Sequence, residues 1–373
     1  MKLTLPVKLA PTPEQARALL GTMERFNAAC DWLAGIAFRE RCANKVALQK
    51  LAYYEVRARF GLAAQPTIRA IGKTVEAYKR DKTIRPRFDP HGAVPYDERI
   101  MDWKGVEHVS LLCLAGREII AVVLAAYQAG RIDRRQGQAD LVYRDSTFYL
   151  YVTVDVPEPP VQDVPDYLGV DLGIVNIAAD SDGTTYAGAQ VNGLRHRHRR
   201  LRKRLQAKQT RSAKRLLKRR RRKERRFNRD VNHTISKRLV ALAKGTRRGI
   251  AVEDLGGIRG RVSVRRSQRA TLHGWSFFHL RQCIAYKAAL AGVPVAAVDP
   301  RNTSRTCPAC GHCDARNRPS QAQFRCLGCG LAGPADTIAA ENIRVRGRAA
   351  CHAAGRDGCG VSESKHPVAS RLL

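Results

Sequence analysis

Four cysteines in two closely spaced pairs carry the clearest chemical signal of this chain. Cys307 and Cys310 form one Cys-x-x-Cys pair, and after fifteen intervening residues Cys326 and Cys329 form a second. Two such pairs at this separation supply the four thiolates that surround one tetrahedral Zn²⁺ ion. A histidine and a cysteine just after the first pair are interpreted as bystanders beside a complete set. A closed site of four thiolates has no position for a reacting water, so we expect a structural ion that folds a short loop.

Three acidic residues far apart in the sequence have the chemistry to act together on a phosphodiester. Asp171 and Glu253 each end a short apolar run, and Asp336 stands seven residues after the last cysteine, where we expect a helix to begin. Phosphodiester hydrolysis needs an activated water and relief of charge on the leaving oxygen, and two Mg²⁺ ions about 3.5–4 Å apart provide both. Hard oxygen ligands hold such ions. We therefore predict that these three carboxylates bind Mg²⁺ and form the catalytic site.

The register of the strand decides between Glu253 and its neighbour Asp254. Glu253 shares a strand face with Gly249 and Ala251, whereas Asp254 shares one with bulkier branched residues. The bulky face should pack into the core, and the small-residue face should leave room for ions. We favour Glu253 for this reason.

The charge of the chain indicates a polyanionic partner. Its 67 Lys and Arg residues against 33 Asp and Glu give a formal net charge of +34 over 373 residues. Such an excess favours nucleic acid, because neutralising phosphates releases condensed counterions. A solvated basic surface, as on a ribosomal protein, would have the same composition, so charge alone does not separate the two.

More than half of that net charge lies in one segment, residues 195–226, with nineteen Lys and Arg and one acid. The segment is compatible with a helix and continues into an apolar stripe at helical spacing, beginning at Phe227 and ending at Ala243. A mobile tail or a targeting signal would not need that stripe, so we favour a docked basic helix that binds phosphates. The residues predicted to contact nucleic acid are Arg195, Arg197, Arg199, Arg200, Arg202, Lys203, Arg204, Arg219, Arg220, Arg221 and Arg222, together with Arg301 and Arg305.

Cysteine usage and apolar runs bound the location of the protein. Eleven cysteines are an odd number, and the chain opens on a strand-like run instead of a signal peptide, so we expect reduced thiols and no disulfide framework. The longest apolar runs reach about half of the ~20 residues that a membrane span needs. We expect a soluble, cytoplasmic prokaryotic protein associated with the nucleoid.

The first part of the chain reads as a strand followed by helices and then by further strands. Residues 2–9 alternate as an edge strand, and Thr12-Pro-Glu-Gln15 predicts a capped helix that runs to about Arg39. Further helices over about 45–60 and 66–80 carry aromatic residues that we expect mainly in the core. Short strands from Arg87 to Val156, among them a hairpin around Asp145-Ser146, would complete a small β-barrel with the helices inserted after its first strand.

A proline-rich linker near 157–165 separates a second unit that opens with a β-meander. Its strands are predicted over 168–171, 175–179 and 184–187, with Asp171 on the first, as in RNase H-like folds. Strands over 249–253 and 293–298 and a helix from about Trp275 to Ala291 follow. After Gly347 the composition favours a disordered tail.

The chain resembles the TnpB family of transposon-encoded, RNA-guided DNA nucleases, which are related to the miniature type V CRISPR effectors. The resemblance covers most of the chain. The segments that carry it are Gly169-Val-Asp-Leu-Gly173, Arg226-Phe-Asn-Arg-Asp-Val-Asn-His-Thr-Ile-Ser236, Trp275-Ser-Phe-Phe278, Gly292-Val-Pro-Val295, Asp299-Pro-Arg-Asn-Thr-Ser-Arg-Thr-Cys-Pro-Ala-Cys-Gly311 and Phe324-Arg-Cys-Leu-Gly-Cys-Gly330.

This resemblance implies an α+β multidomain fold and a Mg²⁺-dependent DNA endonuclease that works with a guide RNA on target DNA next to a short transposon-adjacent motif. Separately from the resemblance, we expect a monomer. The RuvC triad of the family falls on Asp171, Glu253 and Asp336, and its zinc ligands fall on the four paired cysteines. The implied domains are a wedge-type β-barrel (1–10 and 87–160), an inserted helical recognition domain (11–86), an RNase H-like RuvC domain (161–306 and 331–346), an inserted zinc ribbon (307–330) and a disordered tail (347–373).

One departure from the family pattern stands beside the third acid. Ile338 replaces an amide within Asp336-Thr-Ile-Ala-Ala-Glu-Asn342, which changes the local hydrogen bonding. All three acids are kept, so this departure does not imply inactivity.

Two other functional classes remain open from the sequence. An RNA-guided DNA-binding repressor without cleavage would share the fold, although such proteins usually lose a triad acid. A general nucleic-acid-binding accessory protein of transposition would explain the charge but not the carboxylates beside the cysteine pairs.

Overall fold

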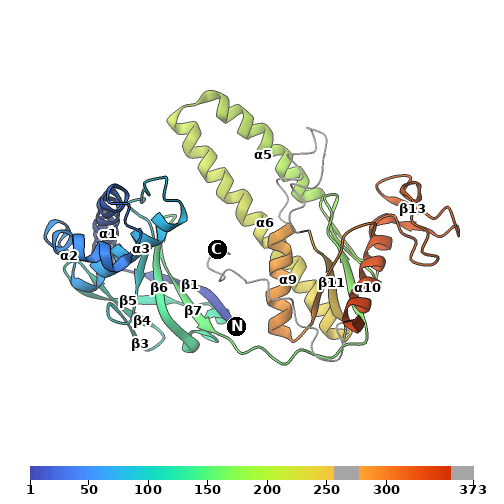
Figure 1. The fold of residues 1–373 in the computed structure, drawn as a ribbon, viewed down its shortest axis with the longest axis horizontal. Helices are drawn as coiled ribbons and strands as arrows, with labels where there is room; N and C mark the ends of the chain where they lie inside the picture. Colours follow the sequence, from blue (N-terminus) through green and yellow to red (C-terminus); the bar gives the residue numbers. More distant parts are fainter. Residues whose placement is uncertain (256–276, 354–373) are drawn as a thin grey trace. The chain divides into compact units, whose positions relative to one another are not determined.

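The computed structural model describes residues 1–255 and 277–353, and it divides into two compact units, Met1–Val156 and the residues from Pro157 onward. The first unit contains a seven-stranded antiparallel sheet (Figure 1). Its strands are β1 (Lys2–Ala10), β2 (Val94–Tyr96), β3 (Met101–Lys104), β4 (His108–Cys113), β5 (Gly116–Val123), β6 (Arg135–Arg144) and β7 (Thr147–Asp155).

The strand order β2-β6-β7-β1-β5-β4-β3 brings the two edges of this sheet together. The edge strands β2 and β3 are joined by four residues of chain, so the sheet curls until it is nearly closed. The predicted hairpin between β6 and β7 turns at Asp145 and Ser146, whose φ angles of 48° and 60° are those of a two-residue turn matched to strand twist. The short strands β2 and β3 fall within the stretch from Arg87 to Val156 where short strands were expected, although their bounds were not predicted.

Three helices lie between β1 and β2 in the chain, as predicted: α1 (Pro13–Arg39), α2 (Lys45–Phe60) and α3 (Ala64–Arg80). The capping box that starts α1 is present, because Thr12 Oγ1 accepts from Gln15 N at 3.3 Å and Gln15 Oε1 accepts from Thr12 N at 3.1 Å. The helical turns α4 (Ala126–Ala129) and η1 (Ile132–Arg134) connect β5 to β6.

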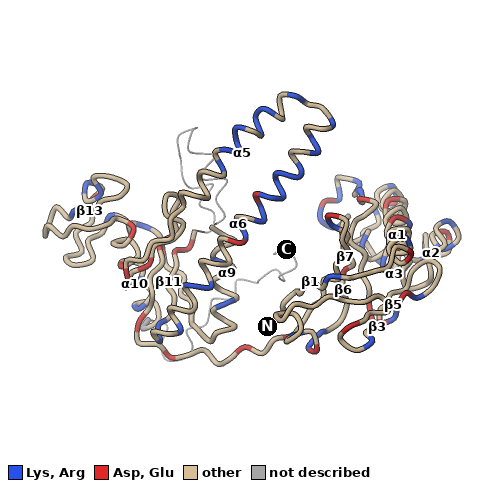
Figure 2. The backbone as a smooth tube through the Cα atoms, turned by 180° about the vertical axis from the view of Figure 1, so that it is seen from behind, with Lys and Arg blue, Asp and Glu red and all other residues tan. Residues whose placement is uncertain are grey.

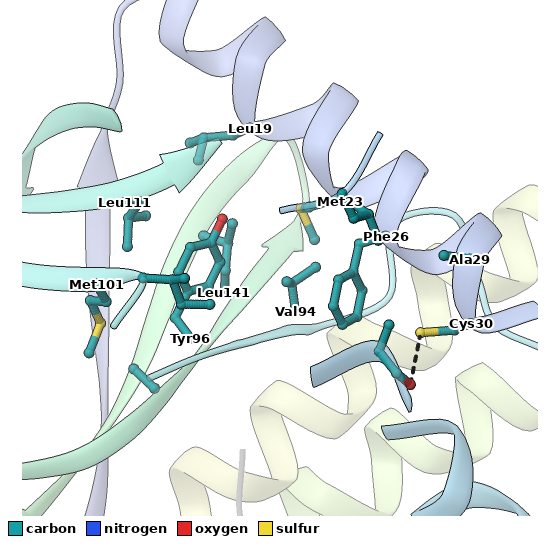
Figure 3. Close-up of a cluster of buried hydrophobic side chains, with 14 of the residues drawn as sticks. Leu19, Met23, Phe26, Ala29, Cys30, Val94, Tyr96, Met101, Leu111 and Leu141 are labelled. Carbon is teal, nitrogen blue, oxygen red and sulfur yellow. Dashed lines mark hydrogen bonds between the residues drawn. The ribbon is translucent and has the colours of Figure 1, made fainter. Parts of the chain in front are cut away.

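Side chains of α1 and of the sheet form the core of the first unit (Figure 3). Leu19, Met23 and Phe26 of α1 are at most 1% exposed and face the sheet. Burial of each such side chain stabilises the fold by about 1.5–3 kcal/mol. Most aromatic residues of the inserted helices are in or against this core, as expected, but Tyr54 is 81% exposed.

A five-stranded sheet with the order β10-β9-β8-β11-β12 organises the second unit. The middle strand β8 pairs in parallel with β11, which pairs in parallel with β12, whereas β9 runs antiparallel to β8 and β10 runs antiparallel to β9. The strands are β8 (Tyr167–Asp171), β9 (Asn176–Asp180), β10 (Thr185–Ala187), β11 (Gly249–Glu253) and β12 (Val295–Val298).

Helices cover both faces of this sheet. On one face, α6 (Arg211–Gly245) and α9 (Phe277–Ala291) pack on the branched residues of β8 and β11. On the other face lies α10 (Ala335–Ala353), which approaches β8 so closely that a Cβ at Gly169 would stand 1.9 Å from Ala340 O. Residues 275 and 276, where the sequence predicted that α9 begins, lie outside the described residues.

The basic segment differs from the single helix that we expected. It forms a helical hairpin of α5 (Ala189–Lys208) and α6, which runs antiparallel to α5 (Figure 1). The chain reverses at Gln209, whose φ of 49° is left-handed, and Thr210 then caps α6 by accepting from Ala213 N at 3.2 Å. A threonine cap inside a charged run is a weak local signal, and the sequence analysis did not use it.

The end of the described chain also differs from the expectation. Residues 347–353, predicted to begin a disordered tail, continue α10 to Ala353. Gly347 does not end the helix because it faces the sheet, where a Cβ would stand 2.5 Å from Ala251 Cβ. The rest of the predicted tail, 354–373, lies outside the described residues. Among the helices of the described chain, none combines the length and the apolar character needed to span a bilayer.

Candidate active site

Asp171 and Glu253 lie side by side at the carboxyl ends of two adjacent parallel strands. Val170 of β8 is in register with Val252 of β11, and the two acids are the next residues on their strands. Alternation along each strand places both on the face that α10 covers. Asp336, in the first turn of α10, lies on that same face, so the structure brings together the three acids that the sequence singled out.

The charges of the three acids act on one another. Burial, followed by the negative charges of Glu253 and Asp336, raises the pKa of Asp171 to about 7. Their carboxylate oxygens do not all lie within 4.8 Å of one another, so they do not form the compact ligand set of a single ion. Two ions about 3.5–4 Å apart need a wider set of ligands, and a cluster of mutually repelling carboxylates favours cations.

Glu253 is buried and held in place, whereas Asp254 is not part of the cluster. Thr303 Oγ1 donates a 2.6 Å hydrogen bond to Glu253 Oε1, and only 7% of Glu253 and 3% of Thr303 is exposed. Burial raises the pKa of Glu253, and the bond from Thr303 opposes that rise. Asp254 is exposed and pairs with Arg281.

The placement of Glu253 agrees with the sequence analysis, but one of its reasons was wrong. The bulky residues of β11 do pack into the core beneath α6 and α9. The small residues of the other face do not leave open space for ions. They accommodate α10, because Gly347 comes against Ala251 and Ile343 packs beside it.

Both oxygens of Asp336 have partners that the sequence analysis missed. Asn176, the first residue of β9, donates through Nδ2 to Asp336 Oδ2 at 2.9 Å. Arg318 Nη2, from the loop between the two cysteine pairs, lies 3.4 Å from Asp336 Oδ1 and lowers the pKa of Asp171 against the larger effect of burial. Thr303 lies within the segment Asp299–Gly311 that carries the family resemblance, so the sequence could have indicated it. No local pattern distinguishes Arg318 from the arginines near it.

The four paired cysteines form one compact cluster. All four sulfurs lie within 4.8 Å of one another, with 3.6 Å between the Sγ atoms of Cys307 and Cys329 and 3.5 Å between those of Cys310 and Cys326. Zinc–sulfur bonds of about 2.3 Å in a tetrahedron require sulfurs about 3.8 Å apart, so these residues fit the ion. Backbone N–H groups of Cys329 and Gly328 point at Cys326 Sγ and help to lower its pKa to about 6, which favours the thiolate.

A buried asparagine joins the two cysteine loops. Asn317, in the short helix η2 (Ala315–Asn317), donates to Arg305 O at 2.9 Å and to His312 O at 3.0 Å, and its Oδ1 accepts from Leu327 N at 2.9 Å. The strands β13 (Gln323–Arg325) and β14 (Ala332–Pro334) complete this small ribbon and lead directly into α10. The ribbon therefore fixes the position of Arg318, which follows Asn317. It also fixes the first turn of α10, which carries Asp336.

Ile338, the departure from the family pattern, has a packing role. It lies against the apolar cluster of Cys307, Phe324, Cys326 and Ala335 at the base of the ribbon. One turn later, Asn342 donates through Nδ2 to Thr303 O and Thr306 O, both at 2.8 Å. Ile338 thus anchors α10 to the ribbon, while Asn342 fixes the segment that supplies Thr303 to Glu253.

Lys and Arg positions are dense along the α5–α6 hairpin (Figure 2). Its predicted contact residues are exposed except for Arg195, which is half-buried. The one acid of the segment, Glu224, joins the two helices, because its Oε2 lies 3.3 Å from His198 Nδ1 and 3.0 Å from Arg202 Nη2. Arg301 and Arg305 are exposed on the segment before the ribbon.

Comparison with known proteins agrees with this arrangement. Residues 149–256 match the family described as "Probable transposase" (OrfB_IS605), and residues 277–343 match "Cas12f1-like, TNB domain". The chain is 33% identical over 220 residues to "CRISPR-associated endodeoxyribonuclease Cas12f1" of Sulfoacidibacillus thermotolerans, covering 54% of this chain and 51% of that protein. It is 35% identical over 116 residues to "TnpB-like protein MJ0751" of Methanocaldococcus jannaschii, covering 31% and 41%.

This chain is related to the TnpB-like and Cas12f1 proteins. A further relative is "Putative RNA-guided DNA endonuclease InsQ" of Escherichia coli K12, 31% identical over 216 residues and 51% of each chain. The chain spans about half the length of Cas12f1 and of InsQ, with 51% of each covered, and 41% of the length of the TnpB-like protein. The two matched family regions meet at the candidate site, since one contains Asp171 and Glu253 and the other contains Asp336 and the four cysteines.

Proposed function

We propose that this TnpB-like chain is an RNA-guided DNA endonuclease, and that Asp171, Glu253 and Asp336 are its catalytic carboxylates. The observation that carries the proposal is the convergence of these three acids at one end of the five-stranded sheet, in a chain with a formal net charge of +34. The strand order β10-β9-β8-β11-β12, with β9 antiparallel to its two neighbours, supports an RNase H-like, RuvC-type domain, and the nearly closed sheet of the first unit would be the wedge domain.

The chain's own residues would prepare the site for in-line hydrolysis. Mg²⁺ ions held by the three carboxylates would supply an activated water and charge relief on the leaving oxygen. Thr303 holds Glu253 in one rotamer, and Asn176 does the same for Asp336. Arg318 brings a positive charge to the site, where it would contact the phosphate that is cut.

The basic hairpin and the ribbon would serve the nucleic acid rather than the chemistry. Sequence would be read by base pairing between a guide RNA and the target strand, and arginines of α5 and α6 would neutralise backbone phosphates. Zn²⁺ bound by the four cysteines would hold the ribbon folded. A short adjacent motif in the DNA would be read by the first unit.

A plasmid-cleavage assay with the RNA that co-purifies with the protein tests this proposal. We expect cleavage in Mg²⁺ only when the plasmid carries a sequence that matches the guide next to its adjacent motif. Asp171→Ala should abolish cleavage and leave RNA binding unchanged. Cleavage by Asp171→Ala at the normal rate would reject the site, whereas binding without any cleavage by the unaltered chain would favour a guided repressor.

A further inference from the structure

A second group of metal-ligating side chains lies outside the candidate active site, between α6 and α9. His233 comes from α6, and His279 and Cys283 come from successive turns of α9. One ligand atom from each lies within 4.8 Å of the other two. Cys283 Sγ is 3.9 Å from His233 Nδ1 and 3.9 Å from His279 Nε2. Neither the proposed nuclease mechanism nor the phosphate-binding surface uses these residues.

We propose that His233, His279 and Cys283 bind one divalent transition-metal ion, with Zn²⁺ as the ion that suits them best. Two imidazoles and one thiolate are ligands that Zn²⁺ takes, and they exclude the hard Mg²⁺ ion. Zinc–nitrogen bonds of about 2.0–2.1 Å and a zinc–sulfur bond of about 2.3 Å place nitrogen and sulfur about 3.6 Å apart in a tetrahedron. The two sulfur–nitrogen distances of 3.9 Å need to shorten by only a few tenths of an ångström, and water would take the fourth position.

The surroundings of the cluster supply the outer partners that metal-binding histidines need. Asn232 Nδ2 lies 2.9 Å from His279 Nδ1, and turning the Asn232 amide by 180° would bring its oxygen to accept a hydrogen bond from Nδ1–H when Nε2 binds the ion. Tyr286 Oη lies 3.3 Å from His233 Nδ1, the nitrogen that is 3.9 Å from Cys283 Sγ. His279 is only half-buried, which gives an ion a path to the cluster.

The positive charges of Lys287, Arg229 and Arg225 act on this cluster and must be weighed against a cation. Lys287 Nζ donates to His233 O at 2.5 Å and to Ser236 Oγ at 2.8 Å, so it is turned toward the α6 backbone. Burial raises the pKa of the Cys283 thiol to about 11, and Lys287 and Arg229 oppose that rise only in part, so binding of the ion must displace the thiol proton. The ion would join α6, the stem of the basic hairpin, to α9.

Metal content of the full-length protein, purified with its bound RNA and dialysed without a strong chelator, tests the proposal. We expect two equivalents of zinc for each chain, one in the ribbon and one in this cluster. Cys283→Ser and His279→Gln should each lose one equivalent, while Cys42→Ser, a matched change of a thiol elsewhere, should lose none. Zinc content that is the same in Cys283→Ser as in the unaltered chain would overturn the proposal.

Cobalt substitution distinguishes the two sites by their spectra. It also gives a result with the unaltered chain if a variant does not fold. Cys326→Ser should lose the ribbon ion and keep a Co²⁺ spectrum with the charge-transfer intensity of one thiolate and two imidazoles. That spectrum should disappear when Cys283→Ser is added, with circular dichroism showing that the helices remain. A Co²⁺ spectrum with only four-thiolate character in the unaltered chain would reject the site without any variant.

Discussion

Arg318 Nη2 lies 3.4 Å from Asp336 Oδ1, so a cation of the cysteine-rich ribbon reaches the third carboxylate of the candidate active site. The same guanidinium lowers the pKa of Asp171, against the larger effect of burial. The ribbon therefore contributes a charged side chain to the site in addition to placing the helix that carries Asp336.

Arg318→Ala should shift the pH dependence of cleavage. Without the guanidinium the pKa of Asp171 rises further above about 7. At a pH below this pKa, each added pKa unit lowers the ionised fraction of Asp171 about tenfold. At neutral pH and limiting Mg²⁺ we expect cleavage to fall by on the order of tenfold and its rising limb to move to higher pH. Arg316→Ala is the control, because Arg316 is exposed and pairs with Asp314 at 2.8 Å in the same loop. An unshifted profile in Arg318→Ala would remove Arg318 from the site.

Asp171→Asn should stabilise the protein when Mg²⁺ is absent. The folded pKa of about 7 lies above the ordinary value of 3.8, so the folded state binds more protons than the unfolded state between these limits. Stability contributed by this group is therefore present at low pH and is lost as the pH rises from about 4 to 7.

Thermal unfolding in Mg²⁺-free buffer without chelator measures this effect. At pH 7.5 Asp171→Asn should melt higher than the unaltered chain, by about 2–4 °C for each kcal/mol of relieved repulsion. Added Mg²⁺ should raise the melting temperature of the unaltered chain and not that of the variant. Equal melting temperatures for the two proteins in Mg²⁺-free buffer would mean that Asp171 is not in a repulsive cluster.

Glu253→Gln and Asp254→Asn should differ sharply in activity. Glu253 is buried beside Asp171, whereas Asp254 is exposed, so the first change removes a proposed metal ligand and the second alters the surface. Loss of a residue that hydrogen-bonds a metal ligand typically lowers activity 10–100-fold, so we expect a loss of cleavage activity of about 10–100-fold for Thr303→Val. For Glu253→Gln, which changes the proposed ligand itself, we expect a loss of at least about a hundredfold. Asp254→Asn should stay within about twofold. If Asp254→Asn lost more activity than Glu253→Gln in a Mg²⁺-dependent cleavage assay, Asp254 and not Glu253 would be the carboxylate of the active site.

Replacing Arg219, Arg220 and Arg221 with glutamine should weaken nucleic-acid binding and flatten its salt dependence. These residues are exposed on α6. Each lost phosphate contact lowers the slope of log K against log salt by about 0.7–0.9. Replacement of the same residues with lysine keeps the charge and should keep the slope. If the glutamine variant retained the full slope in binding titrations at several salt concentrations, this part of the hairpin would not contact phosphates.

Local patterns were enough to predict many elements of the fold. The capped helix after Thr12, the hairpin turn at Asp145 and Ser146 and most strands are in place, because caps, turns and alternation depend on neighbours in the chain. The cysteine cluster was equally predictable, since ligand spacing in a ribbon is a property of a short segment. The reversal at Gln209 and the continuation of α10 past Gly347 were missed, since packing against other elements outweighs weak local preferences there.

The sequence by itself determined which residues have the chemistry: three acids, four thiols and a basic segment with nineteen lysines and arginines. Only the tertiary structure decided that Asn176, Thr303 and Arg318 contact those acids and that His233 meets His279 and Cys283 across two helices. The reason is physical. A side chain's type is set by one position, but its partners are set by strand register and helix packing, which depend on contacts between residues far apart in the chain.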